Sequence, residues 1–392
     1  MKRGDLDCYS GREHAKAKHD LLRNYVERYV MILGVSEAPS LVFVDAFAGP
    51  WKSGAEDLSD TSFGISLEVL RGCAEALGAR FKKRPKIRAL WIEEEETAFA
   101  QLSAAAEKAS DSRVQVTARR GRFQDSIEYI ADFIGPSSYA FIFVDPKGYA
   151  RLIEAEVLAP LLQLQRAELL INYMWDHIRY AFGRPNEAGH QRNLRALYGP
   201  ESEELRRIED PTERSARALA AYEGQLRAQC PSEGRGRLRV LSYPILDTRG
   251  EQHPKYYLVH TTHSAKGLAT FAEQCDKTNV TQALIFQLAY VSRREDRLGS
   301  TDMFGDHVSP ELPVAPPATG AWLNRLPTAG SVVRVDVNVW ADLLEAGRCL
   351  PSALHEGARE LIDAGHLVND DAKGKRPKRP VNYEKAESVR RV

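Results

Sequence analysis

Residues 41–51 read LVFVDAFAGPW, an apolar run that stops at Asp45 and passes into a small turn containing Gly49. Because the run is continuously apolar and does not alternate with polar residues, it predicts a strand that is buried on both faces of a parallel sheet. In an open α/β sheet, ligands bind beyond the carboxyl ends of the strands, where the strand order reverses. The tip of this strand is therefore a candidate ligand site.

Strand and helix patterns alternate from this stretch to residue 173. A helix is expected at 14–33, and further apolar strands are expected at 86–95, 113–119, 139–146 and 167–173. This alternation predicts a parallel sheet with helices on both faces. Two later strand patterns flank a turn-rich segment and predict an antiparallel hairpin, at 238–246 and 255–262. The predicted fold is a Rossmann-like α/β sheet of parallel strands plus a C-terminal antiparallel hairpin.

The length of 392 residues favours two or three domains. We expect the sheet domain to span 1–305, with a charged, all-helical insert at about 176–236. Four prolines between residues 309 and 320 predict a linker at 306–330. In the tail, at 331–392, two helical patterns precede a basic hairpin, which is the order of a winged-helix domain.

Composition says more about the cellular compartment of the protein than about its function. Lys plus Arg equals Asp plus Glu, at 54 each, so the net charge does not indicate a partner. The five cysteines are widely spaced without a CxxC pair, which argues against a disulfide framework or a structural zinc site. The N-terminus lacks the apolar core of a signal peptide, and no run is long enough for a membrane span. We therefore expect a soluble cytoplasmic protein.

Acidic residues stand at or just after the ends of the expected strands: Asp45, Glu93, Asp125 and Asp145. Any one of them alone fits a turn or a helix cap. As an ordered set they favour a nucleoside site, in which one acid accepts hydrogen bonds from ribose and another from the adenine amine. The chain contains neither GxGxxG nor GxxxxGK[ST], so it lacks the usual phosphate cradles. This combination suits S-adenosylmethionine, which carries no phosphate.

These residues also resemble a known family. The stretch VFVDAFAGPW is similar to the DxFAGxG opening of class I S-adenosylmethionine-dependent methyltransferases. FIFVDPKG, ELLINY and YYLVHTTHSAKGL extend the resemblance, in order, to the three-Cys-motif partner proteins. The resemblance covers nearly the whole chain and implies a class I methyltransferase sheet with a C-terminal winged-helix domain. It also implies a partner that carries a three-cysteine motif and is similar to radical S-adenosylmethionine proteins.

The resemblance implies roles for particular positions. The cofactor would be held by Asp45, Phe47, Gly49, Pro50, Glu93 and Asp125. The methyl acceptor would be faced by Asp145, Pro146, Lys147 and Tyr149. Lys147 stands where the family tends to have phenylalanine, which leaves Tyr149 to stack on a flipped base and Lys147 to contact a phosphate. Trp51 stands where the family has glycine.

A basic run, KGKRPKRP at 373–380, lies between the two short strands expected at the C-terminus. Alone, such a run is typical of a solvated tail. Between strands it favours a wing that contacts the phosphates of DNA or RNA. The candidate nucleic-acid-binding residues are Lys373, Lys375, Arg376, Lys378 and Arg379.

The leading interpretation is a methyltransferase-like enzyme that acts on the amino group of a base. One alternative is a catalytically inactive nucleic-acid-binding module whose pocket is closed by Trp51. A second is a metal-dependent nuclease that uses Asp45, Glu93 and Asp145. No carboxylate pair such as DxD stands at a strand tip, and the histidines at 253, 260 and 263 lack metal-ligand spacing, so we assign no metal.

Overall fold

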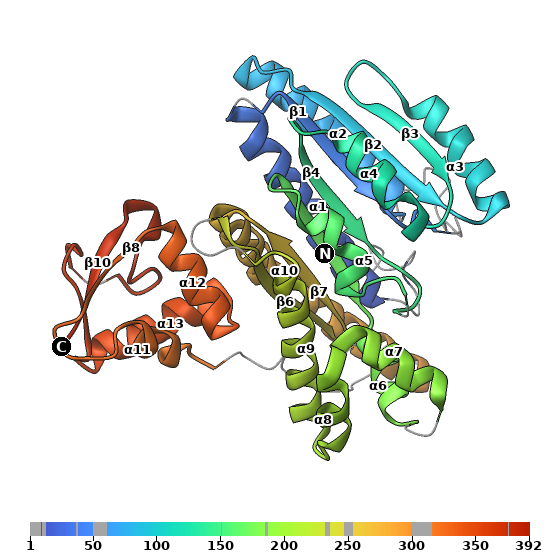
Figure 1. The fold of residues 1–392 in the computed structure, drawn as a ribbon. Coiled ribbons are helices and arrows are strands. Elements are labelled where there is room, and N and C mark those ends of the chain that lie inside the picture. The colour runs from blue at the N-terminus through green and yellow to red at the C-terminus, as the bar shows by residue number, and fades with distance from the viewer. Residues whose placement is uncertain are drawn as a thin grey trace. The chain divides into compact units, whose positions relative to one another are not determined.

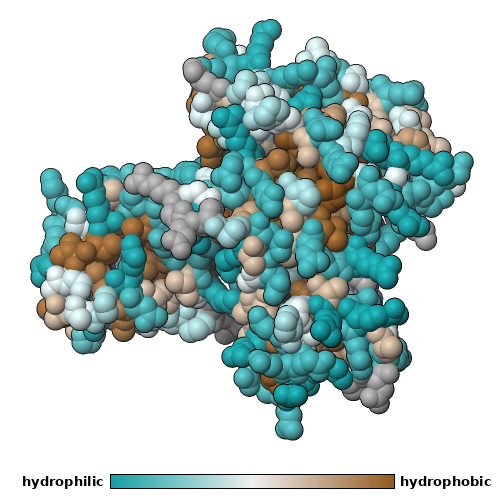
Figure 2. All heavy atoms as spheres, viewed as in Figure 1, coloured by the Kyte–Doolittle hydropathy of each residue, from teal (hydrophilic) through white to brown (hydrophobic). Residues whose placement is uncertain are grey.

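The computed structural model divides the chain into two units, Met1–His263 and Ser264–Val392. In the view of Figure 2, the surface of both units is predominantly hydrophilic. Among the described residues, no helix combines the length and the apolar character that crossing a membrane would require. The structure describes residues 9, 13–36, 38–49, 61–149, 151–184, 187–231, 236–246, 254–298, 316–374 and 376–392. For residues 289–298 it describes the backbone alone.

Within the described residues, the first unit is built around a seven-stranded sheet (Figure 1). The strand order across the sheet is β3-β2-β1-β4-β5-β7-β6. Strands β1 to β5 pair in parallel, whereas β7 is antiparallel to both β5 and β6. The prediction of parallel strands plus an antiparallel hairpin is therefore confirmed. The strands are β1 (Ser40–Asp45), β2 (Lys86–Glu93), β3 (Gln115–Arg120), β4 (Tyr139–Val144), β5 (Ala167–Tyr173), β6 (Arg239–Leu246) and β7 (Pro254–Thr262).

Helices pack on both faces of this sheet, because successive side chains of a strand point to opposite faces. On one face, Tyr25 of α1 packs on Phe141 with ring centroids 5.6 Å apart, and Phe63 of α2 packs on Trp91 at 4.8 Å. The opposite face is covered by α4, α5 and α9 in a buried cluster that includes Val42, Val44, Ile130, Leu158 and Leu226. The helices that follow β1 to β4, with the helix before β1, are α1 (Glu13–Val35), α2 (Ser62–Ala76), α3 (Glu96–Ala109), α4 (Ile127–Ile134) and α5 (Ala155–Leu162).

The segment expected to be a helical insert, at about 176–236, follows strand β5 and is helical along most of its length. Its side chains join the core of the sheet; for example, the Tyr222 hydroxyl donates to the Ile153 carbonyl oxygen at 2.7 Å. Its helices are α6 (Trp175–Phe182), α7 (Ala188–Tyr198), α8 (Ser202–Arg207) and α9 (Pro211–Ala228).

A buried polar cluster around Glu168 of β5 connects helix α1 to strands β5 and β7 of the sheet. The Tyr25 hydroxyl of α1 donates to Glu168, and the Nε2 atom of His260 lies 3.0 Å from the same carboxyl oxygen. Thr262 Oγ1 donates to the other carboxyl oxygen at 3.0 Å. Glu168 is 7% exposed and His260 is fully buried. Buried polar groups need such partners, so the cluster fixes the position of α1 on the sheet.

The second unit contains a smaller antiparallel sheet of order β8-β10-β9. Strands β9 and β10 pair as a hairpin around a long basic loop, and β8 pairs along the other edge of β10. The elements are α10 (Ala265–Leu298), α11 (Thr319–Arg325), β8 (Val332–Val335), α12 (Val337–Gly347), α13 (Pro351–Asp363), β9 (Leu367–Asn369) and β10 (Glu387–Arg391).

Aromatic stacking and a close backbone approach hold this second unit together. Trp340 of α12 is fully buried and stacks on Tyr383, with ring centroids 5.1 Å apart and planes 14° from parallel. The indole N–H of Trp322 donates to the Leu354 carbonyl oxygen at 2.8 Å. Gly357 of α13 lies so close to the Ala318 backbone that an added Cβ would approach it to 2.6 Å. Only glycine permits α13 to pack this closely against the start of α11.

The boundaries of the two units differ from the prediction. We expected the sheet domain to reach residue 305, but α10 packs on α12 and α13, so the division falls after His263. We also expected a linker at 306–330, whereas α11 forms inside that range and buries Trp322. The proline content of this stretch disfavours helix. It does not reveal that Trp322 is buried in a core. Residues 306–315 of the expected linker lie outside the described residues.

We expect Glu168→Ala to destabilise the first unit, because Tyr25, His260 and Thr262 would lose the acceptor that they share. Removing one member of a buried ionic or hydrogen-bonded cluster costs about 3 kcal/mol. Urea unfolding of the purified protein measures this cost, with Glu128→Ala, an exposed site on α4, as the control. A change no larger than that of the control would contradict a structural role for the cluster.

Candidate functional site

The candidate site lies where the direction of strand addition reverses. From β1 the chain adds β2 and β3 on one side, and then returns to add β4 and β5 on the other side of β1. The carboxyl ends of β1 and β4 are therefore the switch point of the sheet, the usual place for a ligand in this architecture. A cavity of about 910 Å³ opens there, and among the predicted site residues it is lined by Phe47, Gly49, Glu93, Asp145, Pro146 and Lys147.

Asp45 ends β1 and is fully buried beside this cavity. Its carboxyl group accepts hydrogen bonds from the Phe47 backbone N–H at 3.0 Å and from Ser62 Oγ of α2 at 2.6 Å. Gly49, in the same turn, has φ of +67°, the left-handed region that glycine adopts most easily. Asp45 thus shapes the turn that lines the cavity, and does not itself appear among the lining residues.

Burial raises the pKa of Asp45 from 3.8 to about 6. The hydrogen bonds from Ser62 and Phe47 act in the opposite direction, the nearby Asp145 raises the pKa further, and Lys18 lowers it. Desolvation dominates because the side chain has no access to water.

Asp145 follows β4 and is held by two side chains from other elements. Lys18 Nζ of α1 lies 2.5 Å from Asp145 Oδ2, and Asn172 Nδ2 of β5 donates to Asp145 Oδ1 at 2.5 Å. Lys18 also lies 5.8 Å from the ring centroid of Tyr256 on β7. The Asp145 carboxylate therefore links the end of β4 to α1 and β5, and Lys18 and Asn172 fix its orientation in the cavity.

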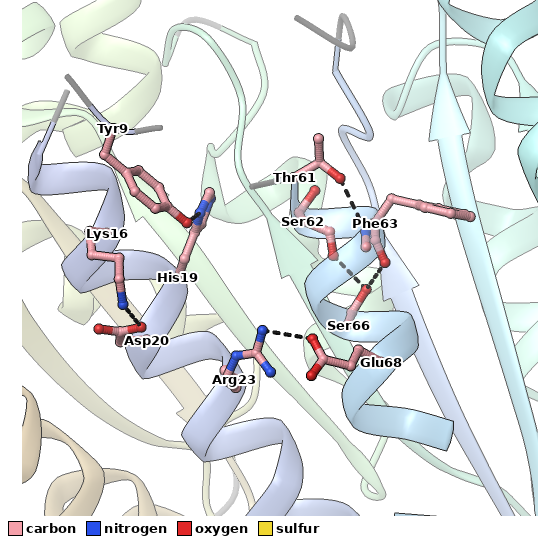
Figure 3. A network of polar contacts seen from close by, with 11 residues as sticks. Tyr9, Lys16, His19, Asp20, Arg23, Thr61, Ser62, Phe63, Ser66 and Glu68 are labelled. Atoms are coloured by element: carbon pink, nitrogen blue, oxygen red, sulfur yellow. Dashed lines mark hydrogen bonds and ion pairs between the residues drawn. The ribbon is translucent and has the colours of Figure 1, made fainter. Parts of the chain in front are cut away.

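Helix α1 forms one wall of the cavity, through His14, Lys18 and His19. Figure 3 shows α1 beside the start of α2, with Arg23 directed toward Glu68. These two side chains form an ion pair at 2.9 Å between the helices. Ser62, which reaches Asp45, stands on the first turn of α2, so the contact between the two helices places it.

The end of β2 supplies Glu93, which is 8% exposed and lines the cavity. One of its carboxyl oxygens accepts from the Glu95 backbone N–H at 2.8 Å. The Ala48 N–H donates to the Ile92 carbonyl oxygen at 2.9 Å, which holds the turn after β1 against the end of β2. Glu93 and the Gly49 turn are thereby brought to the same cavity.

Besides Asp45, two other predicted residues do not line the cavity. Asp125 is exposed and is not a lining residue, whereas its neighbour Gln124 does line the cavity. Tyr149, at 7% exposed, lies in the hydrophobic core and likewise does not line the cavity. Gln124 and Asp125 lie in one short 3-10 turn, Gln124–Ser126, which directs neighbouring side chains in different directions, and sequence position alone does not reveal which one turns inward. Pro50 and Trp51 lie outside the described residues.

Sequence reasoning did not select several residues that the fold brings to the site. Lys18, Ser62 and Tyr256 come from α1, α2 and β7, and none stands at the end of a parallel strand. Asn172, near the end of β5, orients Asp145. In the sequence, Lys18 is one of two lysines in KAKH at 16–19, and Tyr256 is one of two tyrosines in YYLV at 256–259, so neither stands out.

In the second unit, the predicted nucleic-acid-binding residues divide into two kinds. Lys373, Lys378 and Arg379 are exposed on the loop between β9 and β10. Arg376 is instead half-buried and forms an ion pair with Glu387, at 2.5 Å, where Glu387 is only 3% exposed. Arg376 thus contributes to the fold of the loop, and Lys375 lies outside the described residues.

Among the described residues, no group of three or more His, Cys, Asp or Glu side chains is placed to hold a metal ion.

No family model and no curated protein matches the chain. Among solved structures it is similar to Trm1 from Pyrococcus horikoshii in complex with S-adenosyl-L-methionine, at 13% identity over 67% of this chain, with a TM-score of 0.31. It spans only 58% of that Trm1 chain. The methyltransferase domain of bacterial Hen1 matches at 10% identity over 62% of this chain and 99% of its own, with a TM-score of 0.30.

TYW2 from M. jannaschii in complex with AdoMet matches at 12% identity over 60% of this chain and 73% of its own, with a TM-score of 0.24. Scores of this size carry no argument about function. The fold described above therefore stands on the strand order and register of this chain alone.

The raised pKa of Asp45 predicts how stability depends on pH. Between about pH 4 and about pH 6 the native protein holds a proton that the unfolded chain releases, so stability from Asp45 is lost as the pH rises through 6. Asp45→Asn removes this titration. The stability of the variant relative to wild type should therefore rise by about 3 kcal/mol between about pH 4 and about pH 7.

Urea unfolding at several pH values measures this difference. Asp132→Asn, an exposed site on α4, serves as the control and should show a difference that is nearly flat with pH. If the difference for Asp45→Asn were equally flat, burial would not control the ionisation of Asp45.

Proposed function

We propose that the first unit is a class I S-adenosylmethionine-dependent methyltransferase-like enzyme that acts on the amino group of a base in DNA or RNA. One observation carries the proposal: Glu93, the Gly49 turn and the Asp145–Asn172 pair converge on one cavity at the switch point of the sheet. The position of β7, antiparallel beside β5, supports it as well, since the resemblance to class I methyltransferases implies such a hairpin.

The residues around the cavity fit the cofactor. Its volume of about 910 Å³ falls within the range of roughly 300–1,000 Å³ found for ligand pockets. Glu93 would accept hydrogen bonds from the ribose hydroxyls. Phe47 and Phe123, whose ring centroids lie 5.2 Å apart, supply an apolar wall for adenine. Gln124, which offers both a donor and an acceptor, would take the role that we first assigned to Asp125.

S-adenosylmethionine, when bound, supplies an electrophilic methyl group on a sulfonium centre. Methyl transfer needs little acid–base help, so most of the acceleration comes from positioning. Asp45 serves this purpose indirectly, because its hydrogen bond from the Phe47 N–H shapes the turn that contains Gly49. The turn would thereby present its backbone to the cofactor without a side chain in between.

The Asp145 carboxylate and the Pro146 carbonyl oxygen would accept hydrogen bonds from the N–H groups of the acceptor amine, which leaves the nitrogen lone pair free to attack. Asn172 and Lys18 hold the two carboxyl oxygens of Asp145 from different directions. An acceptor amine would approach a carboxylate that is already oriented, so little reorganisation is needed during the reaction.

The proposal assigns substrate capture to the second unit, as a winged-helix domain. Helix α11, strand β8, helices α12 and α13, and the β9–β10 hairpin follow one another in the order of that fold. Lys373, Lys378 and Arg379 are exposed on the loop of the hairpin, where a wing would contact phosphates. Association with a three-Cys-motif protein completes the proposal, and it rests on the family resemblance.

Titration with S-adenosylhomocysteine tests the cofactor site. We expect micromolar binding to the purified protein, and a loss of affinity of about tenfold or more in Glu93→Gln, because a charged hydrogen-bond acceptor is removed. Glu96→Gln, an exposed site on α3 that does not line the cavity, is the control. Absence of binding to wild type would overturn the proposal.

In the same titration, Asp145→Ala should retain binding to within about twofold and lose methyl transfer to mixed-sequence DNA and RNA. Retained transfer in this variant would remove Asp145 from the proposed chemistry.

The wing makes a separate prediction. Lys378→Gln combined with Arg379→Gln should weaken binding to mixed-sequence duplex DNA or RNA and reduce the slope of log affinity against log salt by about 1 for each lost phosphate contact. Lys277→Gln, an exposed site on α10, is the control. An unchanged salt slope in the double variant would show that the loop does not contact phosphates.

A further inference from the structure

The loop between β4 and α5 brings two cations to the cavity that the proposed chemistry does not use. Lys147 and Arg151 both line the cavity and are both exposed. Two other cations that line the cavity are matched by acids: Lys18 pairs with Asp145 at 2.5 Å, and Arg122 approaches Glu94 at 3.6 Å. Among the described residues, neither Lys147 nor Arg151 has an ion-pair partner.

Several contacts hold this loop in place. Tyr149, between the two cations, is buried in the core and anchors the middle of the loop. The Gln124 side chain donates to the Arg151 carbonyl oxygen at 2.7 Å, and the Arg151 N–H donates to the buried carboxyl group of Glu154. Arg151 has φ of 60°, a left-handed conformation that side-chain-bearing residues adopt only at a cost. The loop is thus braced in a conformation that keeps both cations at the cavity.

We propose that Lys147 and Arg151 bind a phosphate of the substrate, next to the group that is methylated. This inference rests on the proposed function and deepens it, because it names the two side chains that would hold a backbone phosphate inside the cavity, beside the target base. Arginine and lysine are the side chains that recognise phosphate oxygens. Lys147 lies two residues from Asp145, so the phosphate would sit beside the residue that receives the amine.

The carboxylate of the cofactor is the other source of an oxyanion in such a cavity. Two probes separate the sources. The first is a dinucleoside monophosphate, compared with the same compound carrying an uncharged methylphosphonate linkage. The second is S-adenosylhomocysteine, which has the carboxylate and no phosphate. Both are titrated into the purified protein and into the double variant Lys147→Gln/Arg151→Gln. The control is Lys86→Gln/Lys108→Gln, which removes two exposed charges that do not line the cavity.

We expect the Lys147→Gln/Arg151→Gln variant to bind the dinucleoside monophosphate about tenfold or more weakly, because charge-assisted hydrogen bonds to the phosphate are lost. Its affinity for the methylphosphonate and for S-adenosylhomocysteine should match that of wild type to within about twofold. The control variant should behave as wild type with all three compounds.

Other results would overturn the inference. If S-adenosylhomocysteine binding fell and dinucleotide binding did not, the two cations would bind the cofactor carboxylate. Equal dinucleotide binding by wild type and variant, or no dinucleotide binding by wild type, would mean that the loop binds no phosphate. If wild type bound the dinucleotide through this loop and did not bind S-adenosylhomocysteine, the phosphate site would stand and the proposed methyltransferase function would fail.

Discussion

The position of helix α1 on the sheet is the constraint on which the rest of the first unit depends. Glu168 of β5 accepts from Tyr25 of α1 and from Thr262 of β7, and His260 lies beside the same carboxyl group. These groups are buried, so none can exchange its protein partner for water without a cost in free energy. The cluster thus sets the position of α1 relative to β5 and β7. Lys18, two turns earlier on the same helix, reaches Asp145 as a result.

The site combines two aspartates that stand at the carboxyl ends of neighbouring strands and have different surroundings. Asp45 is fully buried, and desolvation raises its pKa to about 6. Asp145 is partly exposed to the cavity and has a cation and an amide within 2.5 Å. The first aspartate shapes a turn, whereas the second faces the ligand space. Similar residues in similar strand positions therefore have different roles, because burial and charged neighbours differ between them.

The periodicity of the sequence was sufficient to predict the elements of the sheet and the antiparallel hairpin, since a continuously apolar strand can be stable only inside a covered sheet. The acids at the strand ends were predicted to converge, and Glu93 and Asp145 do line one cavity. The loops were harder to predict. Asp125 is exposed and does not line the cavity whereas Gln124 does, and Tyr149 lies in the core where we expected it to face an acceptor. Side-chain direction in a loop depends on contacts with distant elements, which local patterns do not encode.

The sequence by itself determined the class of the sheet and the edge at which a ligand would bind, because strand ends of a parallel sheet share one edge. Only the tertiary structure decided which side chains meet there. Lys18 and Asp145 are separated by 127 positions in the chain, and Tyr25 and His260 by 235. Tertiary structure also decided that Trp322 belongs to a core and that α10 joins the second unit. Contacts over such separations depend on how whole elements pack, and no short stretch of sequence contains that information.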